Sequence, residues 1–164
     1  MKHNKFFIGD FNSDFCQNND SHSGNILTPF LKTVKNKPES LALWANDLAL
    51  SYGELWAASA PIARCLNEIV QYQKIESIGI IANRSISSFV SIIASLAAGI
   101  PYVPIHYKYP LKRQISILER AECSVLVLDE TNASVMEQLL PKITKSVFIP
   151  VSYTHLTLPT NREV

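Results

Sequence analysis

The chain has 164 residues, of which 47% are hydrophobic, so it is long enough for one globular domain with a buried core. Its 15 Lys and Arg residues nearly balance 14 Asp and Glu residues, which gives a formal net charge of +1. That balance provides no strong field for nucleic acid or an anionic membrane, so we expect neither as a partner.

The three cysteines, Cys16, Cys65 and Cys123, lie far apart and form no CxxC pair. This spacing disfavours both a disulfide framework and a zinc site. Cys65 and Cys123 stand in apolar stretches, which predicts two buried, unreactive thiols. The start of the chain lacks the apolar segment of about 7–15 residues that a signal peptide needs, so we expect a cytoplasmic protein.

Residues 1–25 are rich in Asn, Ser and Asp and show no sustained period, which predicts a poorly ordered lead-in. Apolar residues then recur at helical spacing from Ile26 to Val34. Leu41 to Ala45 is typical of a strand.

Ser51 and Glu54 have the spacing of a capping box, in which each side chain accepts a hydrogen bond from the other residue's backbone N–H. Pro61 lies inside the helix that this box opens and predicts a kink, because proline removes one backbone hydrogen bond. The apolar face of this helix is expected to consist of Leu55, Ser59, Ile62, Leu66 and Ile69.

Ser77 to Ala82 is an apolar run typical of a strand buried on both faces. From Ser85 to Ile105 the chain has no charge, but Gly99 and two prolines interrupt it, so we predict a buried helix and a buried strand instead of a membrane span. Gly99 suits the helix end that requires a positive φ. The expected helix stripe is Ile86, Phe89, Val90, Ile93 and Ala97.

The second half of the chain continues this alternation. A short buried strand is expected at Tyr102–Ile105, and Pro110 suits the start of a helix with an apolar side at Leu111, Ile115 and Leu118. The remaining expected elements are a strand at Val125–Leu128, a helix at Ala133–Leu140 and a strand at Ser146–Ile149. Alternating strands and helices predict an α/β fold with a parallel sheet of βαβ units.

The chain has 5 glycines, and they are scattered. Neither a GxGxxG loop nor a GxxxxGK[ST] loop is present, so a glycine-rich phosphate cradle is excluded for this chain. The four histidines, His3, His22, His106 and His155, show no metal-ligand spacing. His106 follows a strand and could face a site, although an ordinary loop histidine is the favoured interpretation.

Two other groups of charged residues have a functional and a simpler interpretation. Lys108, Lys112 and Arg113 could bind an anion at the helix start after Pro110, but a solvated helix end is favoured. Asp129–Glu130 follows a strand, at the edge where α/β folds bind ligands, but a turn is favoured. We therefore assign no catalytic, cofactor-binding or metal-binding residue.

Two blocks of sequence resemble a known family. Leu50 to Leu55 (LSYGEL) resembles the first core motif of adenylation domains in the adenylate-forming superfamily. Leu96 to Ala121 (LAAGIPYVPIHYKYPLKRQISILERA) resembles the second core motif and its extension. The Tyr-Val-Pro-Ile form is similar to the amino-acid-activating branch, which includes nonribosomal peptide synthetases and D-alanine-carrier ligases. The matching positions are Leu96, Ala98, Gly99, Tyr102, Val103, Pro104, Ile105, Tyr109, Pro110, Arg113 and Ile115.

The resemblance implies a parent enzyme that uses ATP and magnesium to form an acyl-adenylate from a carboxylic acid. It also implies transfer of the acyl group to a thiol, such as the phosphopantetheine arm of a carrier protein. In the family these early blocks build the sheet and do not touch the reacting groups. His106 replaces the usual aspartate and Ala97 the usual lysine, which weakens any assignment of substrate subclass.

The resemblance covers residues 26–150, which we interpret as the first part of the amino-terminal subdomain of such an enzyme. The family's phosphate loop, adenine-binding aromatic, metal-binding acid and carboxy-terminal lysine have no counterpart in this sequence. Without them the chain itself is expected to be inactive, because adenylyl transfer depends on positioned charge. Residues 151–164 back-translate into a sequence similar to a transposon-end sequencing adaptor, so we interpret them as a non-native tail.

Two alternatives remain open. The chain could be a small stand-alone nucleotide- or coenzyme-binding module of flavodoxin-like type, or a non-enzymatic interaction protein. An incomplete sheet would also leave apolar surface uncovered, which predicts a tendency to aggregate.

Overall fold

The computed structural model of the chain describes residues 26–45, 47–129, 133–139, 141 and 147–151, so the predicted lead-in at residues 1–25 lies outside the described residues. In chain order the helices and strands are α2 (Thr28–Asn36), β1 (Leu41–Ala45), β2 (Leu48–Ser51), α3 (Tyr52–Tyr72), β3 (Ser77–Ala82), α4 (Ile86–Ala97), β4 (Tyr102–His106), α5 (Leu111–Arg120), β5 (Cys123–Asp129), α6 (Ala133–Leu139) and β6 (Val147–Val151).

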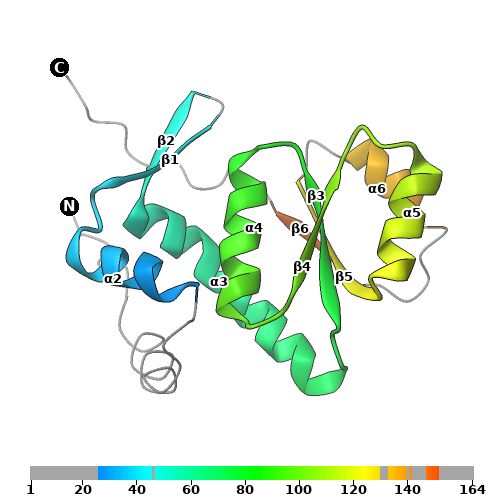
Figure 1. The fold of residues 1–164 in the computed structure, drawn as a ribbon, viewed down its shortest axis with the longest axis horizontal. Helices are drawn as coiled ribbons and strands as arrows, with labels where there is room; N and C mark the ends of the chain where they lie inside the picture. Colours follow the sequence, from blue (N-terminus) through cyan, green and yellow to red (C-terminus); the bar gives the residue numbers. More distant parts are fainter. Residues whose placement is uncertain (1–25, 46, 130–132, 140, 142–146, 152–164) are drawn as a thin grey trace, which may run out of the picture.

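Four of the strands form a parallel sheet in the order β4-β3-β5-β6. The register pairs Ala82 of β3 with His106 of β4, and Asp129 of β5 with Val151 of β6. Helices separate successive strands of this sheet in the sequence, as right-handed crossovers require (Figure 1). The predicted α/β fold with a parallel sheet is confirmed.

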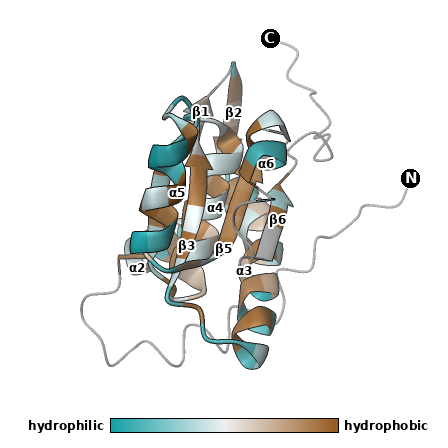
Figure 2. Ribbon diagram, turned by 90° about the vertical axis from the view of Figure 1, so that its right-hand side faces the viewer, coloured by the Kyte–Doolittle hydropathy of each residue, from teal (hydrophilic) through white to brown (hydrophobic). Residues whose placement is uncertain are grey.

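Helices cover both faces of the sheet. Residues of α2, α3 and α4 pack with one face, in a cluster of buried residues that includes Trp56, Leu66, Ala94, Ile80 and Val127. Residues of α5 and α6 pack with the other face, in a second cluster that includes Leu118, Leu139, Ile81 and Leu126. Figure 2 shows β3 and β5 as hydrophobic strands between these helices, which is the patterning expected of doubly covered parallel strands.

A second, two-stranded sheet precedes α3. β1 and β2 pair antiparallel and form a hairpin, whereas the sequence predicted only β1. Ser51 ends β2 and caps α3: its backbone N–H donates to Oε2 of Glu54 at 2.7 Å, and the Glu54 N–H donates to Oγ of Ser51 at 3.3 Å. The predicted capping box is confirmed, and the hairpin sets where the helix begins.

Pro61 lies inside α3, and the helix continues for more than two turns beyond it. Both Pro61 and Ala57, whose carbonyl loses its N–H partner, are exposed. Water can therefore take the place of the missing hydrogen bond, which accounts for a proline at this position.

The buried face of α4 differs from the predicted stripe. Phe89 was expected in the core and is 39% exposed, whereas Ser87, Ser88, Ser91 and Ser95 are buried. Ser91 donates to the carbonyl of Ser87, and Ser95 donates to the carbonyl of Ile100, each at 2.6 Å. These bonds satisfy the hydroxyls inside the protein, so small polar residues can be buried on this helix without an unpaired donor.

β4 was predicted to be a buried strand, and this is wrong for most of its length. It is an edge strand of the sheet, and of its five residues only Ile105 is buried. Pro104 is exposed, as expected for a proline confined to an edge strand. None of the helices that the structure describes has the length and apolar character needed to cross a membrane.

Candidate functional site at the carboxyl edge of the sheet

The order of the strands defines where a ligand would bind on a sheet of this kind. From β3 the chain passes through α4 to β4 on one side, and β5 and β6 then add on the other side of β3. The order therefore reverses between β3 and β5, and crevices for ligands in α/β sheets occur outside the carboxyl ends of the strands at such a point. The turns after β3 and β4, and Asp129 at the end of β5, lie at this edge.

The turn after β3 is held together by its own polar side chains. Oδ1 of Asn83 accepts from the backbone N–H of Ser85 at 3.0 Å. Oγ of Ser85 accepts from the N–H of Ser88 at 3.3 Å and caps α4. Arg84 between them has φ of 60° and an exposed side chain. The hydroxyls thus stabilise the helix start, and the arginine is presented to solvent.

Histidine and two tyrosines gather in the turn between β4 and α5. The ring of His106 stacks on Tyr107 with centroids 5.1 Å apart and lies 5.7 Å from the ring of Tyr109. Its Nδ1 accepts from the backbone N–H of Lys108 at 3.2 Å. His106 is exposed and its Nδ1 is engaged by the turn, in keeping with an ordinary loop histidine.

Two of the basic residues predicted at this helix start lie over tyrosine rings. The guanidinium carbon of Arg113 is 4.1 Å from the ring centre of Tyr109, and Nζ of Lys108 is 5.5 Å from that of Tyr107. These are cation–π contacts at an exposed site. Lys112 is also exposed, and α5 has no side-chain cap and no acidic residue in its first turn. The structure therefore brings the three predicted basic residues to one uncapped helix start.

Gln114 is a buried polar residue at this edge that sequence reasoning missed. It is 2% exposed, and its Nε2 donates to the carbonyls of Tyr107 and Tyr109 at 3.0 and 2.8 Å. Its Oε1 is buried without a hydrogen-bond partner. The available signal was its position, because Gln114 falls on the same helical face as Leu111 and Leu118. Its amide fixes the turn that presents the aromatic and basic residues.

The two described cysteines have different surroundings. Cys123 is buried at the start of β5, and its Sγ lies 3.2 Å from Oγ of Ser77, which is also 2.6 Å from the carbonyl oxygen of Ala121. Burial raises the pKa of the Cys123 thiol, which keeps it protonated and unreactive. Cys65 is exposed on α3, so its predicted burial is wrong. Cys16 lies outside the described residues.

No group of three or more His, Cys, Asp or Glu residues that could hold a metal ion occurs in the part of the chain that the structure describes. His3, His22, His155 and Glu130 lie outside that part.

The two sequence blocks occupy scaffold positions. The first, LSYGEL, runs from the end of β2 into α3, and the second spans the end of α4, β4 and α5. Within the second block Gly99 has φ of 69° after α4, and Pro104 occupies the sheet edge. Ala97, where the family has lysine, is 1% exposed in the core. These residues shape the sheet and its turns.

The family model described as "AMP-binding enzyme" matches residues 30–161. The chain belongs to the AMP-binding enzyme family. The match extends past Pro150 into the segment that the adaptor interpretation excludes, so that interpretation remains a proposal. Solved structures of this adenylate-forming family have the same fold: the nonribosomal peptide synthetase FmoA3, in its alpha-methyl-L-serine-AMP bound form, superposes with a TM-score of 0.68 at 20% identity, over 78% of this chain and 14% of that one.

The curated relatives include a nonribosomal peptide synthetase and similar synthases, in agreement with the resemblance that the sequence motifs predicted. Tyrocidine synthase 2 of Brevibacillus parabrevis is 36% identical over 118 residues, which are 72% of this chain and 3% of that protein. Bacitracin synthase 1 of Bacillus licheniformis is 32% identical over 98 residues, which are 60% of this chain and 2% of that protein. The chain thus spans only a small share of the length of these relatives.

Proposed function

We propose that this chain is the first part of an amino-acid adenylation domain, and that its parent enzyme activates an amino acid as an acyl-adenylate with ATP. The parent would then transfer the acyl group to a thiol on a carrier protein. The observation that supports this proposal is that the sequence motifs of the family coincide with structural elements of the sheet. Both sequence blocks of the amino-acid-activating type lie on the strands and helix ends that build the doubly covered sheet.

We further propose that the chain by itself does not catalyse adenylation. ATP and Mg²⁺ do not fit the described residues. Gly53 lies in α3, Gly79 is buried in β3 and Gly99 follows α4, so none of these described glycines belongs to a glycine-rich phosphate-binding loop that could cradle ATP with its Mg²⁺. The rest of the adenylation domain would supply the nucleotide, metal and acyl sites.

Amino-acid-dependent exchange of pyrophosphate into ATP tests this proposal. The purified chain is expected to give no exchange above background with any of the twenty amino acids, while an intact adenylation domain assayed in parallel gives exchange. Robust exchange by the chain alone would refute the claim that its catalytic groups lie elsewhere. Sequencing of the source DNA beyond the codon of Pro150 tests the origin of residues 151–164 independently, and a cytoplasmic location is proposed for the parent.

One observation favours a second candidate, a small flavodoxin-like module that binds a nucleotide or coenzyme. The strand order reverses between β3 and β5, as it does in doubly wound nucleotide-binding folds. Calorimetric titration of the chain with ATP and with flavin mononucleotide separates the two candidates. Saturable binding at micromolar affinity would support the module, whereas the absence of heat would support the adenylation fragment.

A further inference from the structure

The charges of the chain are segregated along the sequence. From Ser77 to Leu118 there is no acidic residue and there are four basic ones, Arg84, Lys108, Lys112 and Arg113. The rest of the chain therefore combines 11 of the 15 basic residues with all 14 acidic residues and is net acidic. The near-neutral total conceals a basic segment within a mildly acidic protein.

The fold gathers these four basic residues at the carboxyl edge of β3 and β4. Ala82 of β3 pairs with His106 of β4. Arg84 comes two positions after Ala82 and Lys108 two positions after His106, so both lie just beyond the paired ends of the strands. Lys112 and Arg113 lie in the first turn of α5, which starts at the same edge. In Figure 1 both strands run towards the top of the view, where α4 and α5 begin. We call these four residues the basic edge.

The basic edge is available to a partner. All four side chains are exposed. The ion pair formed within the described chain joins Lys74 to Glu76, which precede β3 at the opposite end of the sheet. Two described acids lie towards this edge beyond β3: Asp129 ends β5, on the side of β3 away from β4, and Glu137 lies in α6, which follows β5. The uncapped start of α5 adds partial positive charge.

The chemistry of the edge favours one kind of partner. A small anion would need a pocket with buried hydrogen-bond donors. Gln114 is the buried polar residue here, and its Nε2 already donates to two loop carbonyls. The remaining Oε1 is an acceptor and cannot donate to an anion. Four cations can neutralise only about four phosphates, which gives a small electrostatic contribution to nucleic-acid binding. Exposed cations spread over two turns and a helix start instead match a surface of carboxylates, which they can steer and orient.

We propose that the basic edge is a docking surface for an acidic protein segment, rich in Asp and Glu, which contacts Arg84, Lys108 and Lys112 while Tyr107 and Tyr109 pack against it. This interaction goes beyond the proposed function and depends on the exposed charges of the edge together with its two tyrosines. It is sensitive to salt, because the cations are solvent-exposed.

The test measures binding of a fluorescent glutamate 20-mer to the full chain by anisotropy at low and at physiological salt. Two triple variants have the same net charge: Arg84→Gln/Lys108→Gln/Lys112→Gln removes the basic edge, and Lys32→Gln/Lys35→Gln/Lys37→Gln removes exposed lysines of α2 and its end. Loss of the edge is expected to weaken binding about tenfold, and loss of the α2 lysines less than about twofold. Circular dichroism and thermal melting establish that both variants are folded.

Three results would overturn the proposal. Binding that is undetectable even at low salt would show that the edge does not recognise carboxylates. Equal losses in the two variants would show that only net charge matters. Tighter binding of a thymidylate 20-mer, measured in the same way, would assign the edge to nucleic acid and not to an acidic protein. If the first triple variant does not fold, Lys112→Glu alone is compared with Lys35→Glu by the same criterion.

Discussion

Gly79 of β3 lies directly beneath Leu118 of α5. A Cβ atom at Gly79 would be 2.5 Å from Cδ2 of Leu118 and 2.9 Å from Cδ1 of Leu126. Real Cβ atoms do not approach other atoms so closely, so a side chain at this position would force the terminal methyl groups of Leu118 and Leu126 to move.

Gly79→Ala is therefore expected to destabilise the fold, because Leu118 and Leu126 must leave their positions to admit one methyl group. Overpacking of this kind typically costs about 1–3 kcal/mol. Urea unfolding followed by circular dichroism measures the change. Ser116→Ala, on the exposed side of α5, is the control and should leave stability within about 0.5 kcal/mol. A wild-type unfolding curve for Gly79→Ala would contradict the packing described above.

Glu122 is expected to be a site of local strain. It has φ of 50° between α5 and β5, a left-handed conformation that normally favours glycine at a helix end. Its side chain is exposed, so replacement removes no core contact. Glu122→Gly should stabilise the chain by about 1 kcal/mol. Glu119→Gly, one turn earlier inside α5, should lower the stability of the chain, because glycine weakens a helix interior. Thermal melting measures the change in stability of both variants. A loss of stability for Glu122→Gly would contradict local strain at Glu122.

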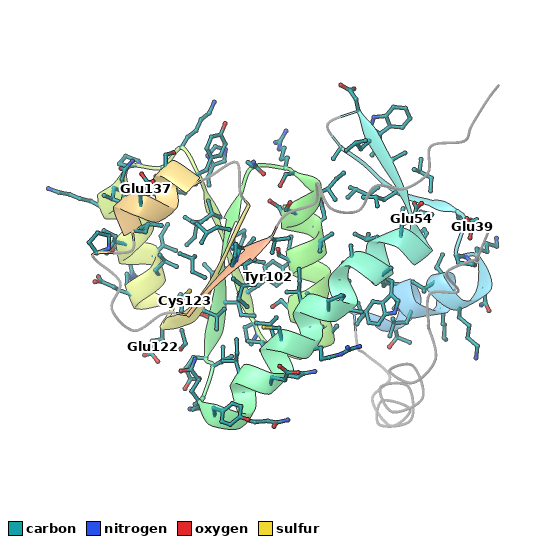
Figure 3. All side chains as sticks on the ribbon, turned by 180° about the vertical axis from the view of Figure 1, so that it is seen from behind. Glu39, Glu54, Tyr102, Glu122, Cys123 and Glu137 are labelled. Atoms are coloured by element: carbon teal, nitrogen blue, oxygen red, sulfur yellow. The ribbon has the colours of Figure 1, made fainter. Side chains whose placement is uncertain are left out.

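The thiol of Cys123 makes stability depend on alkaline pH. Burial raises its pKa, so the folded state holds the proton to a higher pH than the unfolded state does. Its contribution is therefore complete below the unfolded thiol pKa, about 8.5, and is lost as the pH rises through the folded pKa. Figure 3 shows Cys123 beside Glu122 at the start of β5.

Urea unfolding between pH 7 and pH 10 is expected to show a steeper loss of stability for the wild type than for Cys123→Ala. The same burial predicts that iodoacetamide at pH 8 modifies exposed Cys65 well before Cys123, as read by peptide mass spectrometry. Modification of Cys123 at the rate of Cys65 in the folded chain would show that the thiol is accessible.

The hairpin of β1 and β2 exposes large apolar side chains. Leu41, Trp44 and Leu48 are 59%, 68% and 49% exposed. We expect the chain to bind a hydrophobic fluorescent dye and to self-associate, because exposed apolar surface promotes both. Leu41→Lys/Leu48→Lys should reduce both the dye signal and the light scattering. Val70→Lys, at an exposed position of α3, is the control for added charge and should reduce neither by more than a small fraction. Dye binding unchanged in the double variant would place the apolar surface elsewhere.

Local sequence patterns predicted the elements whose geometry is decided locally. The capping box needs only Ser51 and Glu54 at the right spacing. Gly99 can end α4 with a positive φ because glycine has no Cβ atom that would clash in this conformation. The apolar run at Ser77–Ala82 is buried because the chain on either side supplies helices for both faces. The strand β2 was missed because four residues give too short a pattern, and only pairing with β1 makes them a strand.

The other errors concern burial, which neighbours distant in sequence decide. Cys65 and Phe89 lie in apolar helices but face solvent, whereas Gln114 faces the core. The basic edge was visible in the sequence only as Lys108, Lys112 and Arg113 near one helix. Arg84 joins them because β3 and β4 pair in parallel and end at the same edge.

The sequence by itself therefore determined the family, the alternation of strands and helices, and the caps and turns, because these depend on residues within a few positions of one another. Only the tertiary structure decided the strand order, the edge position of β4, the contact of Gly79 with Leu118 and the collection of basic side chains at one edge. Those features depend on which segments pair across long stretches of chain, and that is settled by packing of the whole sheet against its helices.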